Sequence, residues 1–367
     1  MSRPAGRPAR RLGLVVNPTA GGGRAVRTGR LVHDALRSAG HRVHDLSAPD
    51  ARRAGDDAGQ AVATGTVDAL VVVGGDGMVH LGVQAVAGTG VPLGIVAAGS
   101  GNDFARTLGL PARDPVAACA RLCAALDTDV PAVRVVDALH VRGAGPDRWV
   151  AGAVSAGLDA AVNARANATP RPRGPARYAL AALREIARYR PWSYRLTFDG
   201  VHDPDHATTP ERPEWPERLG RSADVRRWLG ADGRWAGRAA LVTVANAPRI
   251  GGGIRVAPGA RVDDGLLDVV VATDLSRPAA AAAFPSMFVG AHLHHPRVHV
   301  VRARGVHVEP GPAVPTGRPG RERPTPSGLE HPLPDAYGDG EHLGALPLRV
   351  TARAGALHVL DAPARRL

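Results

Sequence analysis

A glycine-rich turn with a single carboxylate is the strongest chemical feature of this 367-residue sequence. It reads Gly74-Gly75-Asp76-Gly77 and follows the wholly apolar run Ala69–Val73. Because glycine has no Cβ, a phosphate group can approach the backbone of such a turn closely. A carboxylate at its centre suits a Mg²⁺ ion that accompanies a nucleoside triphosphate. An ordinary strand-to-helix turn capped by Asp76 is the alternative interpretation of this motif alone.

Two further loops strengthen the phosphate interpretation. One starts at Asn17, after the apolar run Leu12–Val16, and contains the hydroxyl of Thr19. The other follows the run Leu93–Val96 and contains Ser100 and Asn102 as polar donors and Asp103 as a second acid. Each is expected to open a helix, whose first N–H groups favour anions. Since loops that follow parallel strands converge on one edge of a sheet, the three together predict a nucleotide site there.

Two acidic clusters in the second half of the chain complete the set of candidate residues. Asp263-Asp264 and Asp339-Gly340-Glu341 are each typical of a β-turn when taken alone. From these residues alone, the β-turn is the favoured interpretation of both clusters.

The elements that would position these residues divide the chain in two. Up to about residue 130, short apolar strands alternate with helices, which predicts a doubly wound parallel sheet over 1–130. From 131 to 345, short strands joined by turns predict a β-sandwich domain, interrupted by Pro-rich stretches near 202–235 and 310–334. The segment 346–367 is expected to complete the first domain. The predicted fold class is therefore α/β plus β.

The composition excludes several functions. All 46 basic residues are arginines, so a Walker-type P-loop, which needs a lysine, is excluded. The net charge is +12, but with 4% aromatic residues and no helix-turn-helix pattern, nucleic acid is not expected as a partner. We find no run of about 18 apolar residues and no signal peptide, which predicts a cytoplasmic protein. The arginine excess suits an anionic membrane leaflet, or equally reflects a GC-rich coding sequence.

One apolar stretch is a candidate contact for a lipid. Ala279–Leu293 is predicted to be a helix, interrupted at Pro285, that carries Phe284, Met287 and Phe288. Together with Leu293, these side chains would form an apolar face toward acyl chains or a bilayer. Packing of the same face against the β domain is the alternative.

The order of the motifs resembles the diacylglycerol kinase catalytic-domain family, which includes bacterial soluble lipid kinases and the sphingosine and ceramide kinases. The resemblance is carried by VVNPTAGGG, GGDG and PLGIVAAGSGNDFARTLGLP in the first half, and by VSAGLDAAV, ANAPRIGGGIRVAPGARVDDGLLDVVV and GDGEHLGALPLRV in the second. It spans nearly the whole chain apart from the N-terminal tail and the two Pro-rich stretches. It implies an ATP-dependent kinase that converts diacylglycerol to phosphatidic acid, peripherally at the inner face of the membrane, and it leaves a homodimer open.

The resemblance also implies roles for individual residues. Asp76 is implied to contact Mg·ATP, and Glu341 is the implied general base, with Asp339 as its orienting neighbour or an alternative base. The implied ligands of a structural Mg²⁺ are the side chain of Asp264 and the carbonyl oxygens of Arg261 and Leu266. The implied ATP-binding residues are Asn17, Pro18, Thr19, Ala20, Gly21, Ser47, Gly74, Gly75, Asp76, Gly77, Met78, Val79, His80, Ser100, Asn102 and Asp103.

The sequence departs from the family pattern directly after GGDG. Members usually have Thr there, followed by Asn-Glu, whereas this chain has Met78, His80 and Leu81. Loss of the threonine hydroxyl removes one contact to phosphate or metal. Three other functions therefore stay open: a kinase for sphingoid or other lipid alcohols, an NAD kinase, and a catalytically silent protein that binds lipid or nucleotide.

Overall fold

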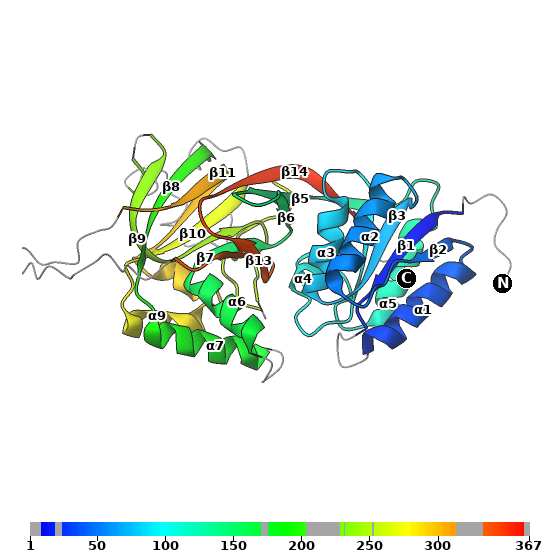
Figure 1. Cartoon of the computed structure of the whole chain (residues 1–367), viewed down its shortest axis with the longest axis horizontal. Helices are drawn as coiled ribbons and strands as arrows, with labels where there is room; N and C mark the ends of the chain where they lie inside the picture. Colours follow the sequence, from blue (N-terminus) through cyan, green and yellow to red (C-terminus); the bar gives the residue numbers. More distant parts are fainter. Residues whose placement is uncertain are drawn as a thin grey trace, which may run out of the picture.

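The computed structural model describes residues 9–18, 24–169, 175–202, 228–230, 232–251, 253–312 and 333–362, which form two lobes side by side (Figure 1). Most of both Pro-rich stretches, and Thr19, Ala20 and Gly21 of the first glycine-rich loop, lie outside the described residues. The long strand β14 (Leu348–Leu360) pairs with β5 (Val133–Arg142), and together they span the junction of the lobes (Figure 1).

The first lobe is the predicted doubly wound α/β unit. Its strands lie in the order β2-β1-β3-β4 and are all parallel, and β14 joins β4 in parallel at the pair Val359–Leu93. The C-terminal segment thus extends the sheet of this lobe. Its elements are β1 (Arg11–Val16), α1 (Arg24–Ser38), β2 (Arg42–Asp45), α2 (Ala51–Ala63), β3 (Ala69–Gly74), α3 (Asp76–Val86), β4 (Leu93–Ala97), α4 (Asp103–Thr107) and α5 (Pro115–Leu126).

Helices cover both faces of this sheet because its central strand is apolar throughout. Leu70 and Val72 of β3 belong to the core formed with α2 and α3, whereas Val71 and Val73 belong to the core formed with α1 and α5. Every residue of β3 is buried. A strand buried on both faces is fixed in position, so the turn at its carboxyl end is presented rigidly at the sheet edge.

The second lobe is the predicted β-sandwich. Strand β8 pairs with both β9 and β11, and β10 lies between those two, so four strands close a ring around one apolar core. On the outer face, Leu241 of β9 and Ile186 of α7 share a second core. Its elements after β5 are β6 (Arg148–Val150), β7 (Ala153–Gly157), α6 (Leu158–Ala168), α7 (Pro175–Arg188), β8 (Trp192–Val201), β9 (Arg234–Ala245), β10 (Leu267–Thr273), α9 (Arg277–Ser286), η4 (Ala291–His294), β11 (Val298–Pro310), β12 (Ala336–Gly338) and β13 (Glu341–Gly344).

The stretch predicted as one helix over 279–293 forms two elements instead. Helix α9 ends at Ser286, and the 3₁₀ turn η4 follows after Gly290, whose φ of +80° lies in the left-handed region. Pro285 has no N–H with which to continue the helical hydrogen bonds, so the helix ends one residue later. The change of direction at Gly290 separates the end of α9 from Leu293, which is buried.

Candidate active site

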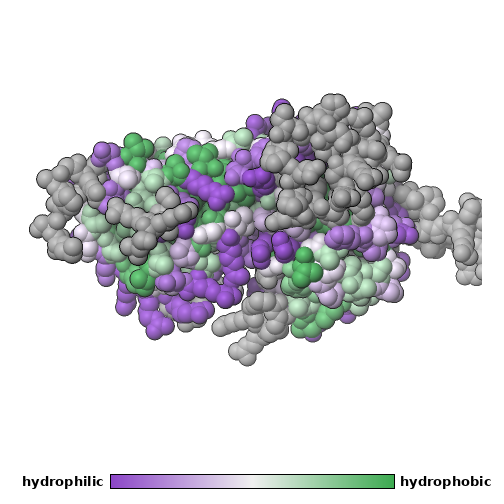
Figure 2. All heavy atoms as spheres, turned by 180° about the vertical axis from the view of Figure 1, so that it is seen from behind, coloured by the Kyte–Doolittle hydropathy of each residue, from purple (hydrophilic) through white to green (hydrophobic). Residues whose placement is uncertain are grey.

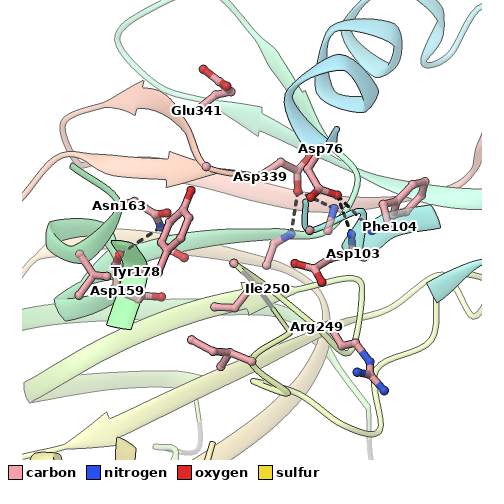
Figure 3. A pocket seen from close by; sticks show the side chains of 18 of the residues that line it. Asp76, Asp103, Phe104, Asp159, Asn163, Tyr178, Arg249, Ile250, Asp339 and Glu341 are labelled. Carbon is pink, nitrogen blue, oxygen red and sulfur yellow. Dashed lines mark hydrogen bonds between the residues drawn. The ribbon is translucent and has the colours of Figure 1, made fainter. Parts of the chain in front are cut away.

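A cavity of about 620 Å³ is lined by residues of both lobes (Figure 3). The first lobe contributes the turns that follow β1, β3 and β4, as expected for ligand sites at the carboxyl edge of a parallel sheet. The second lobe contributes the β6–β7 loop and the turn between β12 and β13. The predicted site residues that line the cavity are Asn17, Gly75, Asp76, Gly77, Met78, Val79, Ser100, Asp103, Asp339 and Glu341.

Asp76 is held by backbone N–H groups of the neighbouring loop. Its Oδ2 accepts a hydrogen bond from the N–H of Asn102 at 2.8 Å, and its Oδ1 accepts from the N–H groups of Asp103 at 2.7 Å and Phe104 at 3.5 Å. These N–H groups start helix α4, where negative charge is favoured. Gly101 leaves room for this arrangement, since a Cβ there would lie 2.6 Å from Asp76 Oδ2.

The ionisation of Asp76 is balanced between opposing effects. Burial, and next the nearby charge of Asp103, raise the pKa of Asp76 to about 6, although the three backbone hydrogen bonds favour the charged form. The carboxylate is therefore mostly ionised at neutral pH. A bound cation would stabilise that ionised form further, as expected for a group that faces a metal–phosphate complex.

Asn102 does not act as the phosphate donor that its loop suggested. It stands in the left-handed region with φ of +58°, and both of its amide hydrogens are used, toward the carbonyl oxygens of Gly99 at 3.0 Å and Ala112 at 2.9 Å. Its Oδ1 accepts from the N–H of Gly99 at 3.1 Å. The side chain fixes the shape of the loop that carries Ser100 and holds Asp76.

Asp339 and Gly340 form the two-residue turn of the β12–β13 hairpin. Both have positive φ, +52° and +87°, which is why an Asp-Gly pair is favoured there. The turn directs the Asp339 carboxylate to the β6–β7 loop, where Ala151, Gly152 and Ala153 donate their N–H groups at 2.8, 2.8 and 3.2 Å. The β-turn interpretation of this cluster is correct as far as the backbone is concerned.

The side chain of Glu341, from the same hairpin, points toward the first lobe. Its Oε1 lies 3.4 Å from the position that a Cβ would take at Gly77, and both residues line the cavity. The side chain is exposed and lies at the edge of the site, whereas Asp76, Asp103 and Asp339 gather nearer its centre (Figure 3). The fold thus brings an acid from each lobe to one cavity.

Several of the residues predicted to bind ATP lie away from the cavity lining. Pro18, Ser47, Gly74, His80 and Asn102 are not among the residues that line the cavity. The Ser47 hydroxyl accepts a hydrogen bond from the N–H of Val16 at 3.0 Å and so ties β2 to the end of β1. Pro18 and Ser47 are exposed, whereas His80 and Asn102 are buried, so these residues stay outside the cavity lining for different reasons.

Sequence reasoning missed a further carboxylate, which lines the cavity on the side of the second lobe. Asp159, in the first turn of α6, accepts hydrogen bonds from the Thr243 hydroxyl at 2.6 Å and the Ala160 N–H at 3.0 Å. Burial raises the pKa of Asp159 to about 6. Asn163 and Tyr178 lie beside it (Figure 3). The available signal was an acid two residues after a strand that ends in glycine, a pattern similar to the one around Asp76.

Beyond Asp159 the cavity becomes apolar. Phe284, Met287 and Phe288, the side chains predicted as an apolar face, line this part. Helix α7 contributes Ala182 and Ile186. The other apolar lining residues here are Leu158, Leu241, Ile250 and Ile254. One cavity therefore joins a polar end at the glycine-rich turns to an apolar end between the helices of the second lobe.

The predicted metal loop lies outside this cavity. Asp264 Oδ2 accepts from Arg302 at 2.9 Å, and its Oδ1 accepts from the N–H of Leu266 at 3.1 Å. Nearby, Asp137 accepts from the N–H of Gly265 at 2.6 Å, and its pKa is raised first by burial and also by the charges of Asp264 and Asp263. This excess of carboxylates fits a hard cation, although Arg302 already compensates part of the charge. Among the described residues no group of three or more acidic, His or Cys side chains is arranged to hold a metal, so carbonyl oxygens would have to complete the set.

Comparison with known proteins agrees with this two-lobe architecture. Residues 11–135 match the family described as the diacylglycerol kinase catalytic domain, and residues 152–361 match the YegS C-terminal NAD kinase beta sandwich-like domain. A crystal structure of a diacylglycerol kinase from Bacillus anthracis (strain Sterne) has a TM-score of 0.60 and 20% identity, and covers 97% of this chain and 98% of its own. This similarity concerns the fold.

Sequence similarity to named proteins identifies the family. A diacylglycerol kinase of Mycobacterium tuberculosis (strain H37Rv) is 33% identical over 347 residues, covering 94% of this chain and 93% of the relative. A Stenotrophomonas maltophilia protein named "Probable lipid kinase YegS-like" is 26% identical over 59% of each chain. The two matching domain families, one after the other along the chain, define a two-domain kinase. The chain belongs to the family of diacylglycerol kinases and YegS-like lipid kinases. In the part of the chain that the structure describes, none of the helices has the length and apolar character needed to span a bilayer.

Proposed function

We propose that this lipid kinase transfers the γ-phosphate of ATP to the free hydroxyl of diacylglycerol and so forms phosphatidic acid. The observation that carries the proposal is one cavity, in which the turns after β1, β3 and β4 and the Asp339–Glu341 hairpin lie at one end and an apolar channel at the other. A diacylglycerol has the matching shape, since its one hydroxyl is attached to two apolar chains. The relative with 33% identity is named a diacylglycerol kinase.

The first lobe supplies the nucleotide site in this proposal. Asn17, Gly75, Gly77 and Ser100 would approach the phosphates, because these residues line the cavity at the ends of β1, β3 and β4. A Mg²⁺ ion bound with ATP would neutralise the charge on the phosphates, and Asp76 is the carboxylate placed to meet it. The hydrogen bonds from the N–H groups of Asn102 and Asp103 hold the Asp76 carboxylate in one orientation at the cavity.

The second lobe supplies the groups that act on the acceptor. Glu341 would accept the proton of the lipid hydroxyl while the oxygen attacks the γ-phosphorus and ADP leaves. Asp339 would keep the hairpin in register, since its carboxylate is bound by three backbone N–H groups. Asn163 and Tyr178 are the polar side chains placed to orient the glycerol part of the acceptor.

The apolar end of the cavity lies close to the surface through which a lipid would enter. Phe288 lines the cavity yet is 42% exposed, and the adjacent Val289 is 69% exposed. Leu183 on α7 is 56% exposed, next to the exposed Arg184. Seen from behind, apolar residues gather on the lower part of the same lobe, beneath a row of hydrophilic ones (Figure 2). This distribution supports a peripheral enzyme that works at an anionic, cytoplasmic membrane face.

A lipid panel tests the proposal. The purified full chain is incubated with γ-labelled ATP, Mg²⁺ and detergent micelles containing diacylglycerol, monoacylglycerol or a sphingoid base, with NAD as a soluble acceptor in a parallel reaction. We expect labelled phosphatidic acid as the main product. A higher kcat/KM for the sphingoid base, or formation of NADP, would replace the proposed acceptor. ATP binding without any labelled product would indicate the catalytically silent alternative.

A further inference from the structure

Helix α3 carries a pair of polar side chains that face the second lobe and not the cavity. His80 and Gln84 are one helical turn apart, and neither lines the cavity. His80 Nδ1 lies 3.5 Å from Asp339 Oδ2, and the two side chains are only 11% and 12% exposed. Asp339 belongs to the second lobe, so this contact crosses the junction directly behind the active site.

Gln84 is fixed by the backbone of the second lobe. Its Oε1 accepts the N–H of Trp149 at 3.1 Å, and its Nε2 donates to the carbonyl oxygen of the same residue. Trp149 belongs to β6, the strand that precedes the Ala151–Ala153 loop around Asp339. Two hydrogen bonds to one residue leave the amide a single orientation, in which Nε2 faces the β lobe and the imidazole.

The orientation of the Gln84 amide determines which ring nitrogen of His80 accepts a hydrogen bond. Gln84 Nε2 lies 3.4 Å from His80 Nε2, and an amide nitrogen can only donate. His80 Nε2 therefore acts as the acceptor, and in the neutral imidazole the proton is on Nδ1, which faces Asp339. Nδ1 is buried and makes no hydrogen bond in this structure, since 3.5 Å exceeds the usual length. A small approach of the two lobes would form that bond and relieve an unsatisfied buried donor.

We propose that His80 is a positioning residue for phosphoryl transfer. By donating from Nδ1 to Asp339, with its tautomer set by Gln84, it draws the Asp339-Gly340 turn toward α3 and so places Glu341 over the Gly77 turn. The inference rests on the proposed function, because it holds that the His80–Asp339 contact sets the distance between Glu341 and the nucleotide. A displacement of about 1 Å in such a geometry costs about a hundredfold in rate.

The experiment compares His80→Ala with His80→Asn, whose amide can still donate to Asp339, and uses the exposed His44→Ala on β2 as the matched control. In the lipid assay we expect His80→Ala to lower kcat about tenfold to a hundredfold, with the KM for ATP within about twofold of wild type. His80→Asn should recover most of that loss, and His44→Ala should behave as wild type. An unchanged kcat in His80→Ala, or an Asn variant as impaired as Ala, would overturn the inference.

A second measurement does not depend on the acceptor. Hydrogen–deuterium exchange of the hairpin amides around Gly338–Glu341 should be faster in His80→Ala than in wild type, and near wild type in His80→Asn. Equal exchange in all three proteins would contradict the inference even if the wild-type chain phosphorylated none of the lipids. If wild type transfers phosphate and the exchange pattern holds while kcat does not change, the contact is structural only and the proposed function stands.

Discussion

Two of the aspartates at the cavity, Asp76 in the first lobe and Asp339 in the second, are bound in the same way but differ in what they connect. Asp76 and Asp339 each accept hydrogen bonds from three consecutive backbone N–H groups. The donors of Asp76 belong to the first lobe, at the start of α4, so that aspartate completes a site within its own lobe. Asp339 is bound by the β6–β7 loop of the second lobe and also meets His80 of the first.

This difference indicates that the first lobe determines ATP binding and the second lobe determines turnover. In the first lobe, which holds the proposed nucleotide site, the hydrogen bonds that fix Asp76 all come from a loop of the same lobe. The second lobe presents the candidate base on a hairpin whose position depends on the junction. We therefore expect changes at Asp76 to affect ATP binding, and changes at the Asp339 hairpin to affect turnover. The predictions below challenge or refine this contrast, from the largest expected effect to the smallest.

Removal of the candidate base should have the largest effect. Glu341→Gln keeps the size of the side chain but cannot accept the hydroxyl proton, so kcat should fall about a hundredfold to ten-thousandfold. ATP affinity, measured by calorimetry, should stay within about twofold. Glu309→Gln on β11 is the control and should retain wild-type turnover. A comparable loss of ATP affinity in Glu341→Gln would mean that the two lobes do not divide the work as described.

A pair of glycine substitutions tests the contrast directly. A Cβ at Gly101 would lie 2.6 Å from Asp76 Oδ2, and a Cβ at Gly152 would lie 2.8 Å from Asp339 Oδ1. Each substitution must displace its aspartate. We expect Gly101→Ala to weaken ATP binding about tenfold or more, and Gly152→Ala to lower kcat by a similar factor with ATP binding retained.

Each of these variants has a matched control in its own lobe. No heavy atom lies within 4 Å of a Cβ placed at Gly59 or Gly145. Gly59→Ala on α2 should leave activity unchanged and stabilise the protein by about 0.5–1 kcal/mol, because alanine is the better helix former. Gly145→Ala should be silent in both assays. If Gly101→Ala and Gly152→Ala lost the same kinetic parameter, the contrast between the two aspartates would be refuted.

The pH dependence of ATP binding should report Asp76. Its pKa of about 6 means that the carboxylate is mostly ionised at pH 7 and mostly protonated at pH 5. If the ionised form binds Mg·ATP, affinity is full above about pH 7 and falls as the pH drops through 6, by about tenfold between pH 7 and pH 5. Titration calorimetry at several pH values measures this, and Asp76→Asn should flatten the profile. A profile that stays steep in the variant would assign the titration to another group, such as Asp159.

The smallest effect is expected at the loop that lies outside the cavity. Removal of divalent ions with EDTA should lower the melting temperature by a few degrees if Asp264 holds a structural ion, because a ligand that binds only the folded state stabilises it. In Asp264→Asn, EDTA should produce no shift. A wild-type melting temperature that does not respond to EDTA or added Mg²⁺ would show that Arg302 alone compensates this carboxylate.

The sequence was informative where chemistry depends on short stretches. The GGDG turn, the loop around Ser100 and the Asp-Gly turn of the hairpin are local patterns, and each appears at a strand end as predicted. The sequence was less informative where several elements contribute one residue each. Asp159 was missed because its partner Thr243 is 84 residues away, and Asn102 was misjudged because its amide is used by backbone groups that only the folded loop brings near.

By itself the sequence determined that apolar strands end in glycine-rich turns. Glycine content, hydrophobic runs and the spacing of acids are properties of neighbouring residues, so they can be recognised without the fold. It also determined that the protein is a kinase of this family, through the order of its motifs. Only the tertiary structure decided that His80 faces Asp339 and not the cavity, and that the cavity continues to α7 and α9. Those facts depend on contacts between elements far apart in the sequence, and such contacts are not encoded in any single segment.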